Sequence, residues 1–213
     1  MSEHATKLKI GRTNKVVDAV LFDDLSLDDL FDAEAIWAPA RVRILQELSK
    51  RNIPPSSWPQ SLHWNWARKA AQLPSSQFGP LGNMRIFGVK ADSQWQGMLL
   101  ARATGNYTRL GQPGRELVYL AYVESAPWNW DDAAIQQEPR YKGVGSQLVE
   151  LAARWSQELG FGGRLGLHGI PQAEDFYRRR CGMTDLGADP DPNYRGMRYF
   201  EFTEEQVKNF LKG

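Results

Sequence analysis

The chain has 213 residues, of which 42% are hydrophobic and 24% are charged, and its net charge is +1. This is an ordinary globular composition, and we expect residues 1–213 to form a single domain. No basic run or stripe occurs, which argues against a nucleic-acid partner. The single cysteine, Cys181, excludes an internal disulfide and fits a reducing compartment. No apolar run reaches membrane-spanning length and the first residues are polar, so we expect a cytoplasmic protein without membrane attachment.

The N-terminal part predicts one strand followed by helices. Residues 15–22 (KVVDAVLF) predict the strand, and the polar residues 1–14 before it are expected to be flexible. Ser26 is typical of a helix N-cap, and Pro39 should break or kink that helix near Trp37. Two further helical pieces are expected over residues 40–50 and 62–73. Together these helices make a helical N-terminal insertion.

The middle of the chain changes to short strands separated by turn residues. Strands are predicted over residues 84–90, 96–103 and 116–123. Their short connections make them antiparallel. The remaining elements are predicted as a helix over 146–159, a strand over 163–168, a helix over 172–180, a strand over 197–202 and a helix over 204–211. The strands at 116–123 and 163–168 are joined through a helix and should form a right-handed parallel pair.

A glycine turn opens the helix that follows the third of these middle strands. The turn is Pro139 to Gly145 (PRYKGVG), and the amphipathic helix begins at Ser146. Such a turn presents unpaired backbone N–H groups and the positive end of the helix dipole. Arg140 and Lys142 add two full positive charges. The sequence therefore predicts a phosphate or pyrophosphate site, although an ordinary turn with two solvated bases would look the same.

Residues 124–139 form an unusually long segment between a strand and this turn. Long ordered loops in compact domains are often functional, so the segment is expected to close over a second substrate. Its acidic residues would attract a cationic amine, although charged loops are commonly just solvated. Tryptophans here and in the insertion could wall a pocket or simply pack in the core: Trp58, Trp64, Trp66, Trp128 and Trp130. The acidic residues are Asp131, Asp132 and Glu138.

Two segments, in order and with a strand between them, match a pair of family motifs. RYKGVG at residues 140–145 is similar to Q/R-x-x-G-x-G/A, and AEDFYRRRCGM at residues 173–183 is similar to A-x-x-(L/F)-Y-x-x-x-G-(F/M). The chain thus resembles the GNAT superfamily of N-acetyltransferases. The order of elements agrees over residues 15–202, and the specific part of the match covers about residues 119–183.

The chain departs from the family pattern at two places. One extra residue lies between Tyr177 and Gly182, so the end of that helix is expected to bulge. Ile170 stands where the family often has an asparagine, which removes one expected cofactor contact.

The resemblance implies an α+β fold: a mixed, mostly antiparallel twisted sheet flanked by helices, with one parallel, splayed strand pair. It implies acetyl-CoA as cosubstrate and direct acetyl transfer to an amine. No cluster has metal-ligand spacing, and no metal is expected. The cofactor-binding residues that it implies, with the turn residues above, are Leu120, Tyr122, Val123, Arg140, Tyr141, Lys142, Gly143, Val144, Gly145, Ser146 and Tyr177.

Two catalytic roles are expected, the first from the same resemblance and the second from the position of the residue in the chain. Tyr177 is the expected general acid for the departing thiolate, and its alternative role is to pack against the sheet. Glu124, at the end of its strand, is the candidate base, acting directly or through water; a solvated glutamate is the alternative. His168 also titrates in a useful range, but a structural histidine is the competing interpretation.

The expected function is acetyl-CoA-dependent N-acetylation of a small-molecule or peptide amine, by an enzyme that could form a homodimer. One alternative is a catalytically weak or inactive fold that acts as an acyl-CoA sensor or a protein-interaction module. Another is a toxin-like enzyme that acetylates aminoacyl-tRNA, against which the near-neutral charge argues.

Overall fold

A computed structural model of the protein describes residues 2–13, 15–73 and 82–212. Within these ranges, nine strands form one sheet in the order β6-β1-β2-β3-β4-β5-β7-β9-β8. All neighbouring strands run antiparallel except β5 and β7, which are parallel. The strands are β1 (Glu3–Ile10), β2 (Val16–Phe22), β3 (Met84–Ala91), β4 (Gln94–Arg102), β5 (Val118–Ser125), β6 (Tyr141–Lys142), β7 (Leu165–Gly169), β8 (Thr184–Ala188) and β9 (Arg198–Phe202). The mixed sheet with one parallel pair is the one expected from the sequence.

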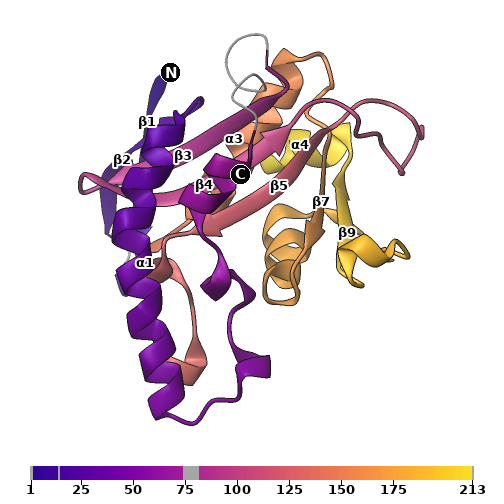
Figure 1. The fold of residues 1–213 in the computed structure, drawn as a ribbon. Helices are drawn as coiled ribbons and strands as arrows, with labels where there is room; N and C mark the ends of the chain where they lie inside the picture. Colours follow the sequence, from indigo (N-terminus) through magenta and orange to yellow (C-terminus); the bar gives the residue numbers. More distant parts are fainter. Residues whose placement is uncertain (1, 14, 74–81, 213) are drawn as a thin grey trace.

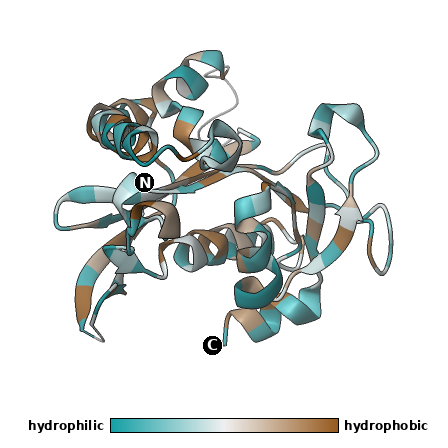
Figure 2. Cartoon of the chain, turned by 90° about the horizontal axis from the view of Figure 1, so that it is seen from below, coloured by the Kyte–Doolittle hydropathy of each residue, from teal (hydrophilic) through white to brown (hydrophobic). Residues whose placement is uncertain are grey.

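Helices cover both faces of this sheet. They are α1 (Leu27–Lys50), α2 (Trp66–Gln72), α3 (Val144–Glu158) and α4 (Glu204–Phe210). Figure 1 shows α1 in front of the sheet and α3 behind it, and Figure 2 shows the two helical layers on opposite sides. The core is split accordingly, with one apolar cluster beneath α3 and α4 and a second beneath α1 and α2.

Helix α3 forms because its apolar positions recur on one face. Leu148, Leu151, Ala152 and Trp155 of the predicted stripe are buried, whereas Leu159, just past the helix end, is 40% exposed. The helix connects β5 to the parallel strand β7 through the short strand β6, so its N-terminus lies at the C-terminal end of β5.

Helix α1 starts as predicted but does not break. Ser26 caps it in a capping box with Asp29. The helix continues through Pro39, so the predicted break near Trp37 is wrong. Proline removes one backbone hydrogen bond, but the buried face on either side keeps the helix in place. Trp37 anchors it by donating from Nε1 to the Trp95 carbonyl at 3.1 Å, and Arg41 is buried one turn later.

Three strands were not expected: β1, β8 and the two-residue strand β6 within the predicted turn. Residues 3–10 form β1, so the prediction that residues 1–14 are flexible is wrong there. Strand β1 pairs with β2 and β6, and its Leu8 is 1% exposed, which ties the segment to the core. Strand β8 lies at the far edge of the sheet, where its residues are mostly half-buried or exposed and leave little pattern to read.

The predicted helix at 62–73 begins only at Trp66, after a 3₁₀ turn over Gln60–His63.

No helix in the described part of the chain combines the length and apolar character that a membrane span needs.

Candidate active site

The parallel pair separates after two residue pairs. Val118 faces Leu165 and Tyr119 faces Gly166, and no further partners join β5 to β7. On its other side β5 carries a bulge, because Leu100 faces Tyr122 whereas the next residue of β4 faces Leu120. A bulge bends and twists its strand. The C-terminal half of β5 therefore has backbone groups that β7 does not use, as the expected splay requires.

A cavity of about 700 Å³ lies at this end of β5. Val123 and Glu124 border it from the strand, and Gly143 and Gly145 from the start of α3. The turn after β7 contributes Tyr177. The segment 129–134 and the insertion turn near Ser57 close other sides. Much of the long segment 124–139 therefore borders the cavity.

The two glycines of the turn have different roles. Gly143 has φ +93° and caps α3 without any side-chain hydrogen bond to the first helical N–H groups. A Cβ on Gly143 would meet nothing within 4 Å, so this position faces open space. A Cβ on Gly145 would lie 3.0 Å from the Phe176 ring, so Gly145 allows close packing against the segment that carries Tyr177.

Most of the expected cofactor residues meet at the cavity, but three do not. The cavity is lined by Val123, Tyr141, Lys142, Gly143, Val144, Gly145, Ser146 and Tyr177. Leu120 is buried in the core beneath α3, and Tyr122 packs on the opposite face, against the α1 and α2 cluster. Arg140 does not line the cavity. Its guanidinium forms an ion pair with Asp92 at 3.1 Å instead.

Arg180 is a cavity residue that the sequence analysis missed. Of three consecutive arginines, Arg178 and Arg179 pair with acidic residues, whereas Arg180 forms no ion pair with any residue that the structure describes. Arg180 lines the cavity. A signal was present: Asp175 lies three and four residues before the first two arginines, but no acid lies there for Arg180.

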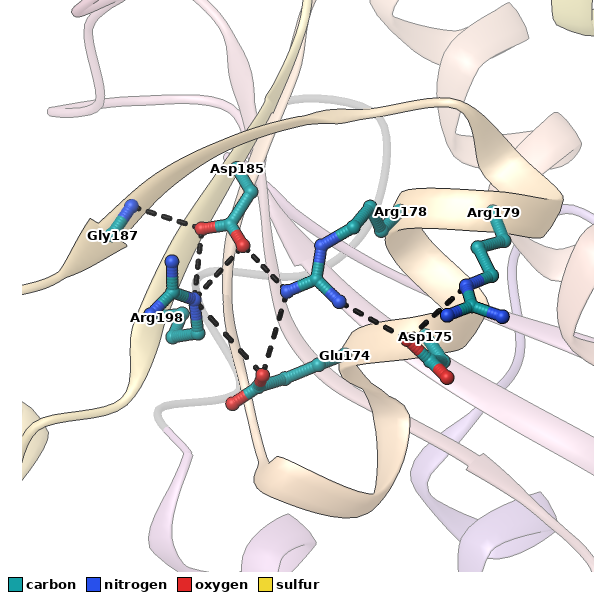
Figure 3. A network of polar contacts seen from close by, with 7 residues as sticks. All are labelled: Glu174, Asp175, Arg178, Arg179, Asp185, Gly187 and Arg198. Carbon is teal, nitrogen blue, oxygen red and sulfur yellow. Dashed lines mark hydrogen bonds and ion pairs between the residues drawn. The ribbon is translucent and has the colours of Figure 1, made fainter.

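The extra residue after Tyr177 is absorbed by a π-helical segment, Phe176–Cys181, which confirms the expected bulge. Arg178 clamps this segment to β8 by donating to Asp185 at 2.6 Å, and Arg198 donates to the same carboxylate at 2.8 Å (Figure 3). Burial alone would raise the pKa of Asp185, but these two hydrogen bonds outweigh it and lower the pKa to about 2. The clamp is therefore charged over the whole physiological range.

The Tyr177 ring is buried between Phe176 and Phe200, with centroid distances of 5.1 and 5.6 Å. Its hydroxyl forms no hydrogen bond with the described residues, and Tyr177 is one of the residues that line the cavity. Burial raises the pKa of Tyr177 well above its usual range, so the phenol keeps its proton. Such a group can donate a hydrogen bond or a proton into the cavity.

The Glu124 carboxylate is held by residues of helices α1 and α2. Its carboxylate accepts from Arg41 Nη2 at 3.1 and 3.2 Å and from Trp66 Nε1 at 2.6 Å, and 2% of its side chain is exposed. Glu34 binds the other side of the Arg41 guanidinium at 2.7 Å. Burial raises the pKa of Glu124 to about 7, because it outweighs the contributions of Arg41 and Trp66. Glu34 and Arg41 are further residues that the sequence analysis did not single out.

The other candidates have structural partners. His168 contacts Asp189 at 2.9 Å through Nε2 and the Tyr119 hydroxyl at 2.8 Å through Nδ1. Burial lowers the pKa of His168 despite Asp189, which favours a neutral, structural ring. Asp131 and Asp132 line the cavity, whereas Glu138 pairs with Arg12.

The five tryptophans divide between the cavity and the core. Trp130 lines the cavity. Trp58 and Trp128 each donate a hydrogen bond to protein acceptors, at 2.9 and 2.8 Å. Trp64 and Trp66 pack near Tyr122. Among the described residues, no group of three His, Cys, Asp or Glu side chains could hold a metal ion.

A mixed sheet whose single parallel pair separates at a cavity, with a glycine-opened helix at the end of the strand, defines the GNAT N-acetyltransferase fold. This chain has that fold.

Solved structures agree with this assignment. PaiA N-acetyltransferase from Thermoplasma acidophilum, in complex with coenzyme A, shares 13% identity over 94% of this chain and 98% of its own, with a TM-score of 0.50. An uncharacterised protein from Bacillus halodurans shares 8% identity over 98% of this chain and 94% of its own, with a TM-score of 0.52. At the level of sequence, no family model and no curated protein matches this chain. Such low identities establish the fold alone.

Proposed function

We propose that this protein is an N-acetyltransferase that takes acetyl-CoA and transfers its acetyl group directly to an amine. The observation that carries the proposal is the shared cavity. The N-terminus of α3, which has no side-chain cap, the separated end of β5 and Tyr177 all border the same cavity. PaiA, which has the same fold, was solved with coenzyme A.

The residues present fit a coenzyme A diphosphate. Gly143 faces open space, and the first N–H groups of α3 have no side-chain cap. Lys142 and Arg180 add positive charge at the cavity. Backbone N–H groups at a helix start bind phosphate oxygens well, because the helix dipole adds to their partial charges. Bound acetyl-CoA would supply the activated thioester.

Direct transfer to an amine needs two proton movements. The departing thiolate takes up one proton, and the attacking amine loses one. Tyr177 is the group placed to give the first, because its phenol is neutral and borders the cavity. Glu124 is the candidate acceptor of the second, because a pKa of about 7 suits a base near neutral pH. Its carboxylate lies on the α2 side of β5, so an amine would have to reach it there. A homodimer and a cytoplasmic location remain predictions from the sequence.

Replacing Tyr177 by phenylalanine tests the proposal. Wild-type protein should release the thiol of acetyl-CoA in the presence of a suitable amine from a screened panel. Y177F should bind acetyl-CoA as tightly but turn over about 100-fold more slowly, because only the proton donor is lost. Thiol release measures turnover, and isothermal titration measures affinity.

No binding of acetyl-CoA by the wild type at high micromolar concentration would overturn the proposal. Tight binding without thiol release for any amine would favour the acyl-CoA sensor instead. An unchanged rate in Y177F would remove Tyr177 as the acid.

Replacing Arg180 by glutamine should weaken acetyl-CoA binding about five- to tenfold, because a charge-assisted contact to a phosphate is lost. The loss should shrink at high salt, since the contact is exposed. Arg179→Gln is the matched control: Arg179 is the neighbouring exposed arginine, but it pairs with Asp175. Equal effects of the two variants in titrations at low salt would mean that Arg180 makes no specific contact.

A further inference from the structure

Two aromatic rings on the insertion side of β5, Trp64 and Tyr122, lie against the ammonium group of Lys69, and Trp66 packs against Tyr122. Trp64 and Trp66 approach the Tyr122 ring edge-on, with centroid distances of 5.4 and 6.4 Å. The Lys69 Nζ atom, from α2, lies 3.4 Å from the centre of the Tyr122 ring and 4.8 Å from that of Trp64. We call Trp64, Trp66 and Tyr122 the aromatic box. Aromatic faces attract cations, and such clusters recognise alkylammonium groups.

The aromatic box lies beside the proposed reaction centre. Tyr122 precedes Val123 and Glu124 on β5, and these two residues border the cavity. Trp66 joins the box to the candidate base by donating to Glu124 at 2.6 Å. The box is therefore on the side of β5 that the Glu124 carboxylate faces, and α3 with its glycine turn lies on the other face of the sheet.

The pKa of Lys69 shows how the surroundings of the aromatic box affect an amine. Burial lowers the pKa of Lys69 from 10.5 to about 8, although nearby Glu124 favours the charged form; Arg41 lowers it further. An amine attacks a thioester only after it has lost its proton. A site that partly dehydrates an ammonium group next to a carboxylate thus prepares it for acetylation.

We propose that the aromatic box, with Glu124 beside it, is the acceptor subsite for a primary alkylammonium group on an unbranched stem, and that Lys69 occupies it as an internal surrogate. This inference rests on the proposed function and names its acceptor class. The incoming amine displaces the Lys69 side chain, and its nitrogen then lies near Glu124. Lys69 thereby competes with the substrate and weakens its binding.

Two substitutions of Lys69 distinguish the effect of emptying the aromatic box from the effect of removing the lysine's positive charge. Lys69→Ala empties the box, whereas Lys69→Met removes the same charge but keeps an unbranched stem in place. We expect K69A to bind n-butylamine at least tenfold more tightly than the wild type, and K69M to show no such gain. Quenching of tryptophan fluorescence measures binding without acetyl-CoA, and the KM for n-butylamine in thiol release measures it in turnover.

Arg68→Ala is the control for net charge, because Arg68 is exposed on the same helix. Titrations with Nα-acetyl-lysine amide alongside n-butylamine distinguish a lysine side chain from a free small amine, and tighter binding of either to K69A supports the subsite. Equal gains in K69A, K69M and R68A would overturn it, because the effect would then be electrostatic. Amine binding to K69A without any thiol release would leave the subsite standing and count against the proposed function.

Discussion

Replacing Gly143 by glutamate is expected to reduce acetyl-CoA affinity at least 100-fold. Gly143 has φ +93°, which costs an L-residue about 1–2 kcal/mol, so the turn itself would be strained. The new side chain would enter open space at the uncapped start of α3. There its carboxylate would take the N–H groups that we assign to the diphosphate and would repel the ligand's negative charge. Isothermal titration with acetyl-CoA measures the loss.

Gly114→Glu is the matched control for this variant. Gly114 has φ +87°, and a Cβ there also meets nothing within 4 Å, but it lies outside the cavity. Both variants should therefore lose similar stability in thermal melts, and only G143E should lose acetyl-CoA. Wild-type affinity in G143E would show that the diphosphate site is elsewhere.

Replacing Arg41 by methionine is expected to lower the free energy of unfolding by about 3–5 kcal/mol near neutral pH. Arg41, Glu34 and Glu124 are 4%, 6% and 3% exposed. The guanidinium is the group that lies between the two carboxylates. Its removal leaves two buried carboxyl groups without a cationic hydrogen-bond donor, and the chain cannot hydrate their charged forms without opening. Urea unfolding measures the change.

The loss of unfolding free energy in R41M should be smaller at low pH than at high pH. Burial raises the folded-state pKa of Glu124 to about 7 from 4.5, so folding takes up a proton between these values and stability falls as pH rises through this window. Without Arg41 the preference for the protonated acid is stronger, so R41M should be less impaired at pH 5 than at pH 8.

Arg51→Met provides the comparison for R41M. Arg51 pairs with Glu47 at 2.8 Å on the surface at the end of the same helix, where both side chains are more than one third exposed. Surface pairs of this kind contribute about 0.3–0.5 kcal/mol. Equal destabilisation of the two variants, or a loss in R41M that does not change with pH, would contradict the account of the buried cluster.

Local patterns in the sequence were sufficient for much of the site. Gly143 and Gly145 mark the helix start, because the left-handed backbone at the first and the close approach of Phe176 at the second both require glycine. The extra residue after Tyr177 predicted a bulge that proved to be a π-helical segment. The Arg180 charge could also have been found, from the missing acid one turn before it.

Other features depend on residues far apart in the chain. Strand β1 has few apolar residues, and its place follows from pairing with β2 and with β6, more than 100 residues away. Helix α1 survives Pro39 because Trp37 and Arg41 are held by β4 and β5. The sequence predicts Arg140 as a phosphate ligand, whereas in the structure it forms an ion pair with Asp92 on the β3–β4 turn.

The sequence by itself determined most of the helices and strands and marked the glycine turn at which α3 starts, because caps, glycine turns and apolar periodicity act within a few residues. Only the tertiary structure decided the surroundings of Glu124 and Lys69, where we propose that the acceptor binds. There, α1 and α2 bring Arg41, Trp66 and Lys69 against Tyr122 and Glu124 of β5. Burial and long-range pairing set the pKa values of Lys69 and Glu124, and neither can be read from spacing along the chain.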